Sequence, residues 1–384
     1  MSITRRAALP PMVGSLPPGQ GTSAAQAPAG VLGRATQPVQ SDLRLHVPEA
    51  DRRIPVTKRG LLALGAASCL AGRRASAEAF RARSGGYPVR PIRLLVGFAP
   101  GGAADIVARL ATPLMSGIMD CPVAVENRPG AGGNLATEMA ARGPDDGHNL
   151  VMLTPGQVIT NPLMMRVPYD PERDIVPIAR MTLGQLVLVV RRESPARDVN
   201  DLLARARGSS DTAPLTYGSP GPGTSHHLAM EMLKRRGGFE AVHVPYRGSG
   251  QAIVDLLSGK IDMMIDSFST SFPQIQAGAL RPLAVTGPDP HPDLPGVPTL
   301  NSVVPGVVMT TWTGIGGPGT LPRDLVTYLA EVMRQVVGHR TFIDRLRELG
   351  SEASWLKSDS FVTAISKERR EFADLIRAAN IRAD

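Results

Sequence analysis

Leu94–Asp105, with the sequence Leu-Leu-Val-Gly-Phe-Ala-Pro-Gly-Gly-Ala-Ala-Asp, joins a short apolar run to a glycine-rich turn and the start of a helical pattern. This order predicts a strand, a turn at Pro100-Gly101-Gly102 and a helix N-terminus near Asp105. The free backbone N–H groups of such an N-terminus lie at the positive end of the helix dipole, so they can bind an anion without a charged side chain. Similar turns recur at Tyr217–Thr224 and Pro245–Gly250. Three such turns predict a cleft that holds a small acidic molecule.

Short apolar runs alternate with helical patterns along the rest of the chain. Strands are expected at residues 92–96, 122–126, 149–153, 186–190, 215–218, 241–244, 261–266, 281–286 and 310–315. Helices are expected at residues 105–118, 134–142, 198–207, 224–236, 251–257, 272–277, 323–337, 341–349 and 359–379. Pro113 should kink or restart the first of these helices. The alternation is typical of the α/β class and predicts βαβ units and a mostly parallel sheet with helices on both faces.

Two crossings between lobes are expected. The apolar run Leu186–Val190 leads into the charged, proline-containing Arg191–Arg197, and Thr310–Ile315 would bring the chain back. Residues 87–190 plus 314–384 would then form lobe 1, and residues 191–313 would form lobe 2. In this arrangement the ligand site lies between the lobes, at the C-terminal ends of the strands.

The basic character of the chain belongs to its first part. The 384 residues carry a formal net charge of +8, and the length is sufficient for two domains. Residues 1–77 hold 10 Lys and Arg against 3 Asp and Glu, which leaves 32 against 31 in the remainder. Because residues 78–384 also lack a basic stripe with interleaved aromatic residues, nucleic acid is not an expected partner.

The first 77 residues predict export. Residues 1–55 are rich in Pro, Gly, Ala, Ser and Gln, and we interpret them as disordered or as a misassigned extension with a true start at Val56. Residues 56–77 resemble a signal peptide, because a basic pair precedes the apolar run Leu61–Ala71 and Ala75-Ser76-Ala77 offers a cleavage site near Ala77. Lys58-Arg59 also fits a loose twin-arginine signal. The alternative is a basic N-terminal helix that is not cleaved.

Cysteine content and motifs argue against several classes of function. Only Cys121 would remain after cleavage, so no internal disulfide is expected, and lipid attachment at Cys69 is left open. Residues 78–384 contain no apolar run long enough for a membrane span. The Walker A, G-x-S-x-G and His-Glu-x-x-His motifs are absent. His226 and His227 would point about 100° apart on a helix and are poorly placed to share a metal. No catalytic residue, metal or cofactor is therefore expected.

Eight short motifs occur in order between residues 87 and 382 and carry a family resemblance. They are Tyr87-Pro88-x-x-Pro91-Ile92-Arg93, Phe98-x-Pro100-Gly101-Gly102-x-x-Asp105, Glu126-Asn127-Arg128-Pro129-Gly130-Ala131-Gly132-Gly133, Pro168-Tyr169-Asp170, Gly223-Thr224-x-x-His227-Leu228, Val244-Pro245-Tyr246-Arg247-Gly248, Leu283-Ala284-Val285-Thr286 and Pro295-x-Val297-Pro298-Thr299. Together they resemble the Bug-type extracytoplasmic receptors, the substrate-binding proteins of tripartite tricarboxylate transporters. The resemblance implies a two-lobe fold similar to type II periplasmic binding proteins. It also implies capture of a small carboxylate between the lobes and delivery to membrane transporter subunits.

The resemblance further implies a set of ligand-binding residues. They are Phe98, Ala99, Pro100, Gly101, Gly102, Asp105, Thr154, Gly156, Ser219, Gly223, Thr224, His227, Tyr246, Arg247, Gly248 and Asp266. The turn 98–105 would hold one carboxylate through backbone N–H groups and ordered water. Ala103 and Ala104 stand where members commonly carry hydroxyl residues, which leaves backbone and water to bind there. Asp266 would accept a hydrogen bond from a ligand hydroxyl, a ligand amine or a water.

Several of these residues have a purely structural alternative. The glycines of the turns can serve only to reverse the chain, and we favour that interpretation for Asn127–Gly133. Asp105 can act as a helix N-cap alone, and Arg247, where most members carry Lys, can be a solvated turn residue. His227 can bond a carbonyl inside its helix, and Asp266 can pair with a nearby cation.

The sequence thus predicts an exported, monomeric, non-enzymatic receptor that binds a small carboxylate, closes by a hinge at the two crossing strands and meets a membrane transporter. Two alternatives stay open. One is a ligand-sensing module for a signalling partner. The other is a hydrolase or isomerase on the same fold that uses Asp105, His227 and Asp266.

Overall fold

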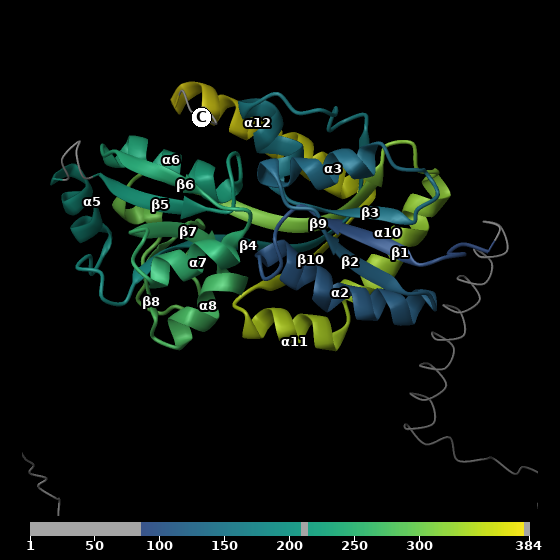
Figure 1. Ribbon diagram of the computed structural model, residues 1–384, viewed down its shortest axis with the longest axis horizontal. Coiled ribbons are helices and arrows are strands. Elements are labelled where there is room, and N and C mark those ends of the chain that lie inside the picture. The colour runs from purple at the N-terminus through teal and green to yellow at the C-terminus, as the bar shows by residue number, and fades with distance from the viewer. Residues whose placement is uncertain (1–85, 209–213, 380–384) are drawn as a thin grey trace, which may run out of the picture. The chain divides into compact units, whose positions relative to one another are not determined.

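Two long strands, β4 (Ile175–Arg191) and β9 (Thr310–Pro318), run side by side through the middle of the computed structural model (Figure 1). The structure describes residues 86–208 and 214–379. β4 changes partners along its length: residues 175–185 pair with β9, and residues 186–191 pair with β7 (Met263–Ser267) and β8 (Leu280–Val285). This one strand therefore joins two sets of strands.

We name the two sets sheet A and sheet B. Sheet A contains the first part of β4 together with β9, β3 (Asn149–Leu153), β1 (Ile92–Val96), β2 (Val123–Asn127) and β10 (Glu352–Lys357). Sheet B contains the last part of β4 together with β7, β8, β5 (Leu215–Ser219) and β6 (Ala241–Pro245). With their helices the two sheets form the two lobes of a mixed α/β fold.

The prediction of a mostly parallel sheet is wrong. The pairs β1–β2, β1–β3, β5–β6 and β5–β7 are parallel, but every pair that contains β4 or β9 is antiparallel. The reason lies in the connectivity. β4 carries the chain from sheet A to sheet B and β9 brings it back into sheet A, so these two neighbours must run in opposite directions.

The lobe boundaries stay a prediction. Backbone pairing moves from sheet A to sheet B between Gln185 and Leu186, several residues before the boundary that we place after Val190. The predicted extension at 1–55 and the predicted signal peptide at 56–77 lie outside the described residues.

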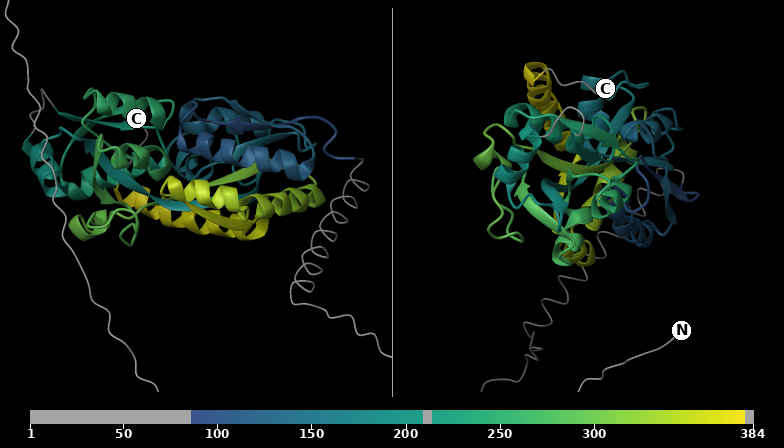
Figure 2. Two further views of the ribbon diagram at one scale, coloured as in Figure 1. Left: turned by 90° about the horizontal axis from the view of Figure 1, so that it is seen from below. Right: turned by 60° about the vertical axis from the view of Figure 1, so that its left-hand side comes forward.

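Helices cover both sheets. Around sheet A lie α2 (Ala103–Met119), α3 (Asn134–Ala141), α4 (Asn161–Met164), α10 (Arg323–Val337), α11 (Arg340–Glu348) and α12 (Ser358–Ala379), with short turns η1 (Ala131–Gly133) and η2 (Gly156–Thr160). Around sheet B lie α5 (Val199–Gly208), α6 (Ser225–Gly237), α7 (Ser249–Leu257), α8 (Phe268–Gln276) and α9 (Leu300–Val303). Figure 2 shows the C-terminal helices, in yellow, lying beside the blue elements of sheet A. α2 continues through Pro113, so the expected restart of the helix there is wrong.

The core explains why Leu94–Val96 in β1 is an apolar run, whereas Arg93 of the same strand is exposed. Ile92, Leu94 and Val96 are fully buried in a cluster that includes residues of α2 and α10. Leu95 points to the opposite face and is buried in a second cluster with residues of α3. Because successive side chains of a strand alternate between faces, consecutive apolar residues are needed where a strand is covered on both sides, as at residues 94–96. Helices therefore cover both faces of sheet A, as predicted.

Candidate functional site

A cavity of about 80 Å³ lies where the turns of sheet A meet those of sheet B. Its wall is built from the turns that follow β1, β3, β5, β6 and β7, from the middle of β4, from the first residues of β9 and from the turn before β10 (Glu352–Lys357). Ten of its residues are Ser or Thr, and among the described residues no Asp, Glu, Lys or Arg side chain lines it. A wall of this kind offers many hydrogen bonds but no compensating charge.

Four helices begin at this cavity. The first residues of α2 come from sheet A, and those of α6, α7 and α8 come from sheet B. The N-caps Gly102, Gly248 and Ser267 of α2, α7 and α8 make no side-chain capping hydrogen bond. In α6 the N-cap Thr224 accepts from the His227 N–H alone. Backbone N–H groups in the first turns of all four helices are therefore available to a ligand, at the positive ends of four helix dipoles. The cavity can bind an anion without a cationic side chain.

Some of the predicted site residues line the cavity, and the others lie outside its wall. Phe98, Gly102, Thr154, Thr224 and Gly248 line the cavity. The remaining predicted residues are placed behind the wall or beside it: Ala99, Pro100, Gly101, Asp105, Gly156, Ser219, Gly223, His227, Tyr246, Arg247 and Asp266.

Asp105 supports the turn that opens the cavity. Its carboxylate accepts hydrogen bonds from the Gly101 backbone N–H at 2.9 Å, from Arg109 Nε at 2.9 Å and from Asn127 Nδ2 at 2.7 Å. Burial raises the pKa of this carboxyl group, but the hydrogen bonds from Arg109, Gly101 and Asn127 outweigh that effect and hold the pKa below its ordinary value. Asp105 is thus engaged in fixing the Pro100-Gly101-Gly102 turn.

Asp266, at the end of β7, is fully buried and does not line the cavity. Its carboxylate accepts hydrogen bonds from three hydroxyl groups: Ser249 Oγ at 2.6 Å, Thr270 Oγ1 at 2.5 Å and Ser271 Oγ at 2.7 Å. These donors come from α7 and α8, so Asp266 ties together the starts of two helices that face the cavity. The structure gives it this positioning role, and the ligand contact of Asp266 stays a prediction.

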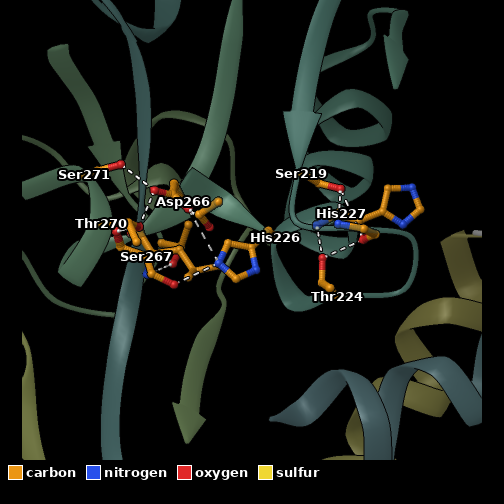
Figure 3. Close-up of polar contacts among 12 residues, drawn as sticks. Ser219, Thr224, His226, His227, Asp266, Ser267, Thr270 and Ser271 are labelled. Carbon is orange, nitrogen blue, oxygen red and sulfur yellow. Dashed lines mark hydrogen bonds and ion pairs between the residues drawn. The ribbon is translucent and has the colours of Figure 1, made fainter. Parts of the chain in front are cut away.

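The two adjacent histidines of α6 point in different directions (Figure 3). His226 lines the cavity, and its Nε2 lies 2.9 Å from Ser267 Oγ and 4.0 Å from Asp266 Oδ1. His227 turns away from the cavity, accepts a hydrogen bond from the Gly223 N–H at 3.2 Å and stacks on His243, with 4.3 Å between the ring centroids. The ring in the wall is therefore that of His226, whereas the ligand-binding residue predicted from the sequence is His227.

Two polar atoms of the α6 first turn lack a partner. Within the described residues, Ser225 Oγ and His226 Nδ1 are buried and make no hydrogen bond. Burial lowers the pKa of His226, while the nearby Asp266 carboxylate works in the opposite direction. Because buried polar atoms normally find a partner, these two atoms are candidates for ligand contacts.

Two direct contacts join the turns of the two lobes beside the cavity. The Ala99 N–H donates to the Arg247 carbonyl at 2.8 Å, and the Thr160 hydroxyl donates to the Gly223 carbonyl. Gly223 has a φ of +69°, and a Cβ at this position would lie 1.8 Å from Asn161 Oδ1. The absence of a side chain at Gly223 therefore allows the two lobes to approach each other closely. Tyr246, whose hydroxyl donates to Asp255 Oδ2 at 2.9 Å, and Arg247 lie beside the cavity and not in its wall.

Other wall residues were not predicted. Trp312 on β9 is one of them, and its indole N–H donates to Glu368 Oε2 on α12 at 2.7 Å. Phe268 and Leu183 add further apolar surface. These residues lie far apart in sequence and belong to no local motif, so only the pairing of β4 with β9 and the packing of α8 could have located them.

The chain matches the family described as "Tripartite tricarboxylate transporter family receptor" over residues 107–381. It is 37% identical over 292 residues to a protein of Pseudomonas sp. (strain P51) encoded in the tcbD-tcbE intergenic region, covering 76% of this chain and 86% of that protein. Among solved structures, an R. palustris protein with adipate shares 32% identity and a TM-score of 0.74, covering 77% of this chain and 99% of that one. The periplasmic binding protein BugD shares 27% identity and a TM-score of 0.74, covering 77% and 99%.

Residues 86–208 and 214–379 hold neither a metal-binding cluster nor a membrane-spanning helix. No group of three or more His, Cys, Asp and Glu side chains is arranged to hold a metal ion. None of the helices there has the length and apolar character needed to cross a membrane.

Proposed function

We propose that this chain, which belongs to the tripartite tricarboxylate transporter family of receptors, binds a small carboxylate with an apolar body in the cavity between its lobes. The observation that carries the proposal is the convergence of four helix N-termini on a wall without charged side chains. Dipoles and N–H groups stabilise a carboxylate there, whereas a cation would meet four positive dipole ends.

The composition of the wall supports the ligand class. Phe98, Val107, Leu183, Phe268 and Trp312 supply apolar surface, while the helix N-termini supply N–H groups. One carboxylate would bind at the α2 N-terminus and the other end of the ligand at the starts of α6, α7 and α8. The relative from R. palustris has a structure with adipate, a linear dicarboxylate with an apolar chain, which fits such a wall.

Binding and release would form the whole functional cycle. β4 and β9 are the strands at the passage between the lobes, so the lobes would close by bending there, and the Ala99–Arg247 and Thr160–Gly223 contacts would form in the closed state. The closed receptor would then be recognised by membrane transporter subunits. We place the protein in the periplasm, as a monomer, after removal of the predicted signal peptide near Ala77.

The alternative of catalysis has little support at this site. Asp105 and Asp266 each accept three hydrogen bonds from the protein, and neither lines the cavity. Ser219 Oγ lies 2.7 Å from His243 Nε2, but Ser219 is fully buried outside the wall. A sensing role would use the same cavity and differ only in the partner that reads the closed state.

A thermal-shift panel on the full chain tests the proposal. It should contain mono-, di- and tricarboxylates, acidic amino acids and aromatic acids, with hexane-1,6-diol as the uncharged match for adipate. A ligand at a hundred times its Kd stabilises the folded protein by about 2.7 kcal/mol, so its melting temperature should rise, and the diol should have no effect. If no acid raises the melting temperature, even after unfolding and refolding to remove bound ligand, the proposal is wrong. Recovery of the ligand unchanged would exclude an enzyme acting on it.

A further inference from the structure

His226 is the one titratable side chain that lines the cavity among the described residues. It lies in the first turn of α6, and its side chain is 12% exposed. One ring nitrogen, Nε2, contacts the protein, whereas the other, Nδ1, has no hydrogen-bond partner there. Figure 3 shows Nδ1 on the side of the ring away from Asp266 and Ser267.

The surroundings of the ring determine which nitrogen holds the proton in the neutral form. Asp266 Oδ1 lies 4.0 Å from Nε2, and Ser267 Oγ lies 2.9 Å from it. A negative charge on this side favours the tautomer with hydrogen on Nε2. Nδ1 then carries a buried lone pair without a donor. Of the elements packed on α6, β7 contributes Asp266, and η2 contributes no titratable side chain. Tyr217 of β5 and His243 of β6 contact Glu231 and His227 on α6, and Arg207 of α5 bonds the Gly237 carbonyl at the other end of the helix.

Nδ1 is itself buried, so a carboxylate at the α6 N-terminus would meet this lone pair when binding opens the wall beside the ring. Two acceptors facing each other repel, and a buried acceptor without a donor is destabilising. One proton between Nδ1 and the carboxylate removes both penalties. It leaves the imidazole with a hydrogen on each nitrogen, one directed to Ser267 and Asp266 and the other to the ligand. The unpartnered Ser225 hydroxyl is placed on the same helix turn to donate to the same ligand group.

We propose that the cavity takes up one proton from solvent together with its carboxylate ligand, and that this proton is held between His226 Nδ1 and a ligand carboxylate oxygen. The inference rests on the proposed function and deepens it. The receptor would capture acid plus proton as a unit, so its affinity would increase as the pH falls. No covalent bond of the ligand forms or breaks. Ser225 and His226 would also distinguish a carboxylate from an uncharged hydroxyl compound.

The coupling of ligand binding to proton uptake sets how strongly Kd depends on pH. Burial keeps the pKa of His226 below its ordinary value in the empty cavity, so the free protein carries a neutral ring near pH 7. When binding brings one proton, Kd changes by up to about tenfold for each pH unit. The affinity for adipate should therefore fall about tenfold between pH 7 and pH 8 when uptake is complete.

Calorimetric titration of the full chain tests the inference. The probe is adipate, or the panel dicarboxylate with the largest thermal shift if adipate has none. The titration is run between pH 6.5 and 8.5 in phosphate and in Tris, because proton uptake makes the measured enthalpy depend on the ionisation enthalpy of the buffer. We expect this buffer dependence in the wild type and its loss in His226→Gln, together with a Kd that no longer changes with pH. His339→Asn, at an exposed histidine outside the cavity, is the matched control and should behave as wild type.

Each outcome is informative. Binding without buffer dependence in the wild type, or buffer dependence that persists in His226→Gln, overturns the inference and leaves the receptor function intact. Absence of binding by every carboxylate overturns the proposed function and this inference with it. If His226→Gln does not bind at all, 15N spectra of histidine-labelled wild type decide: Nδ1 of His226 should gain a hydrogen on adding ligand at pH 7.5, and a bare Nδ1 in the complex contradicts the inference.

Discussion

The backbone N–H of Ala99 donates to the carbonyl of Arg247 across 2.8 Å, and this bond joins the turn after β1 in sheet A to the turn after β6 in sheet B. A second bond of the same kind runs from the Thr160 hydroxyl to the Gly223 carbonyl. Both acceptors belong to glycine-rich turns that the sequence selects as candidates for ligand binding. In the structure these turns also hold the two lobes together. Part of the need for glycine in these turns therefore comes from the close contact between the lobes.

Replacing Thr160 with Val should weaken ligand binding. Thr160 is fully buried, and valine has the same shape but no hydroxyl, so the Gly223 carbonyl would lose its side-chain donor in the closed state only. A lost hydrogen bond of about 1.4 kcal/mol corresponds to a Kd about tenfold higher. Calorimetric titration with adipate measures this change.

Thr363 provides the matched control for this variant. Its exposed side chain donates to the Asp359 carbonyl within α12 and does not line the cavity, so Thr363→Val should bind like wild type. Equal affinity of Thr160→Val and wild type would show that the Thr160–Gly223 contact does not contribute to closure.

Asp105→Asn should destabilise the protein at neutral pH by about 1–3 kcal/mol. The amide can no longer accept from Gly101, Arg109 and Asn127 together. The wild-type carboxyl has a lowered pKa, so its stabilisation is present above the pKa of the unfolded chain and is lost as the pH falls through the folded value. Urea unfolding at pH 7 and pH 3 should therefore show a difference between the two proteins that shrinks in acid.

Asp374→Asn is the control that tests whether removing any carboxylate destabilises the protein as Asp105→Asn should. Asp374 pairs with Arg377, but its side chain is 77% exposed, and exposed pairs contribute little. A change below about 0.5 kcal/mol is expected. Equal losses in both variants would contradict a special role for Asp105.

Local patterns were sufficient to predict most elements. The β1 strand at residues 92–96 and the α10 helix at residues 323–337 have the predicted bounds, because each has a strong apolar pattern with a clear end. The first eleven residues of β4 and all of β10 were missed. β10 is only partly buried, and residues 175–185 contain Pro177, Arg180 and Gly184, which interrupt the alternation that marks a strand. Pairing with β9 holds them extended despite this composition.

The site was harder to predict because its chemistry depends on side-chain direction. The sequence places a glycine turn before α2 and before α6, and the structure has both at the cavity. It could not show that His226 faces the cavity, since the helix rotation that separates two adjacent histidines by about 100° does not say which one faces inward. Nor could it show that three hydroxyls would converge on Asp266. Those contacts join α7 and α8 to β7 and exist only after folding.

Trp312 links the cavity wall to a buried acid. Its indole N–H donates to Glu368 Oε2 at 2.7 Å, and within the described residues Glu368 Oε1 has no partner. Burial raises the pKa of Glu368 to about 7, although the hydrogen bond from Trp312 acts in the opposite direction. The folded protein therefore keeps a proton on this group at pH values where the unfolded chain releases it.

Glu368→Gln should make stability less dependent on pH. Between the ordinary Glu pKa and about 7 the folded wild type binds the extra proton, so its free energy of unfolding falls as the pH rises across that window and stays low above it. Glutamine can still accept from Trp312 and has no charge to bury, so the variant should equal wild type near pH 4.5 and exceed it by roughly 1–3 kcal/mol at pH 8. Urea unfolding followed by tryptophan fluorescence, with Trp355→Phe in both backgrounds to isolate Trp312, measures the difference. If the free energies of unfolding of the two proteins changed with pH in parallel, Glu368 would titrate as an ordinary exposed carboxyl. The environment of Trp312 would then not depend on the charge of Glu368.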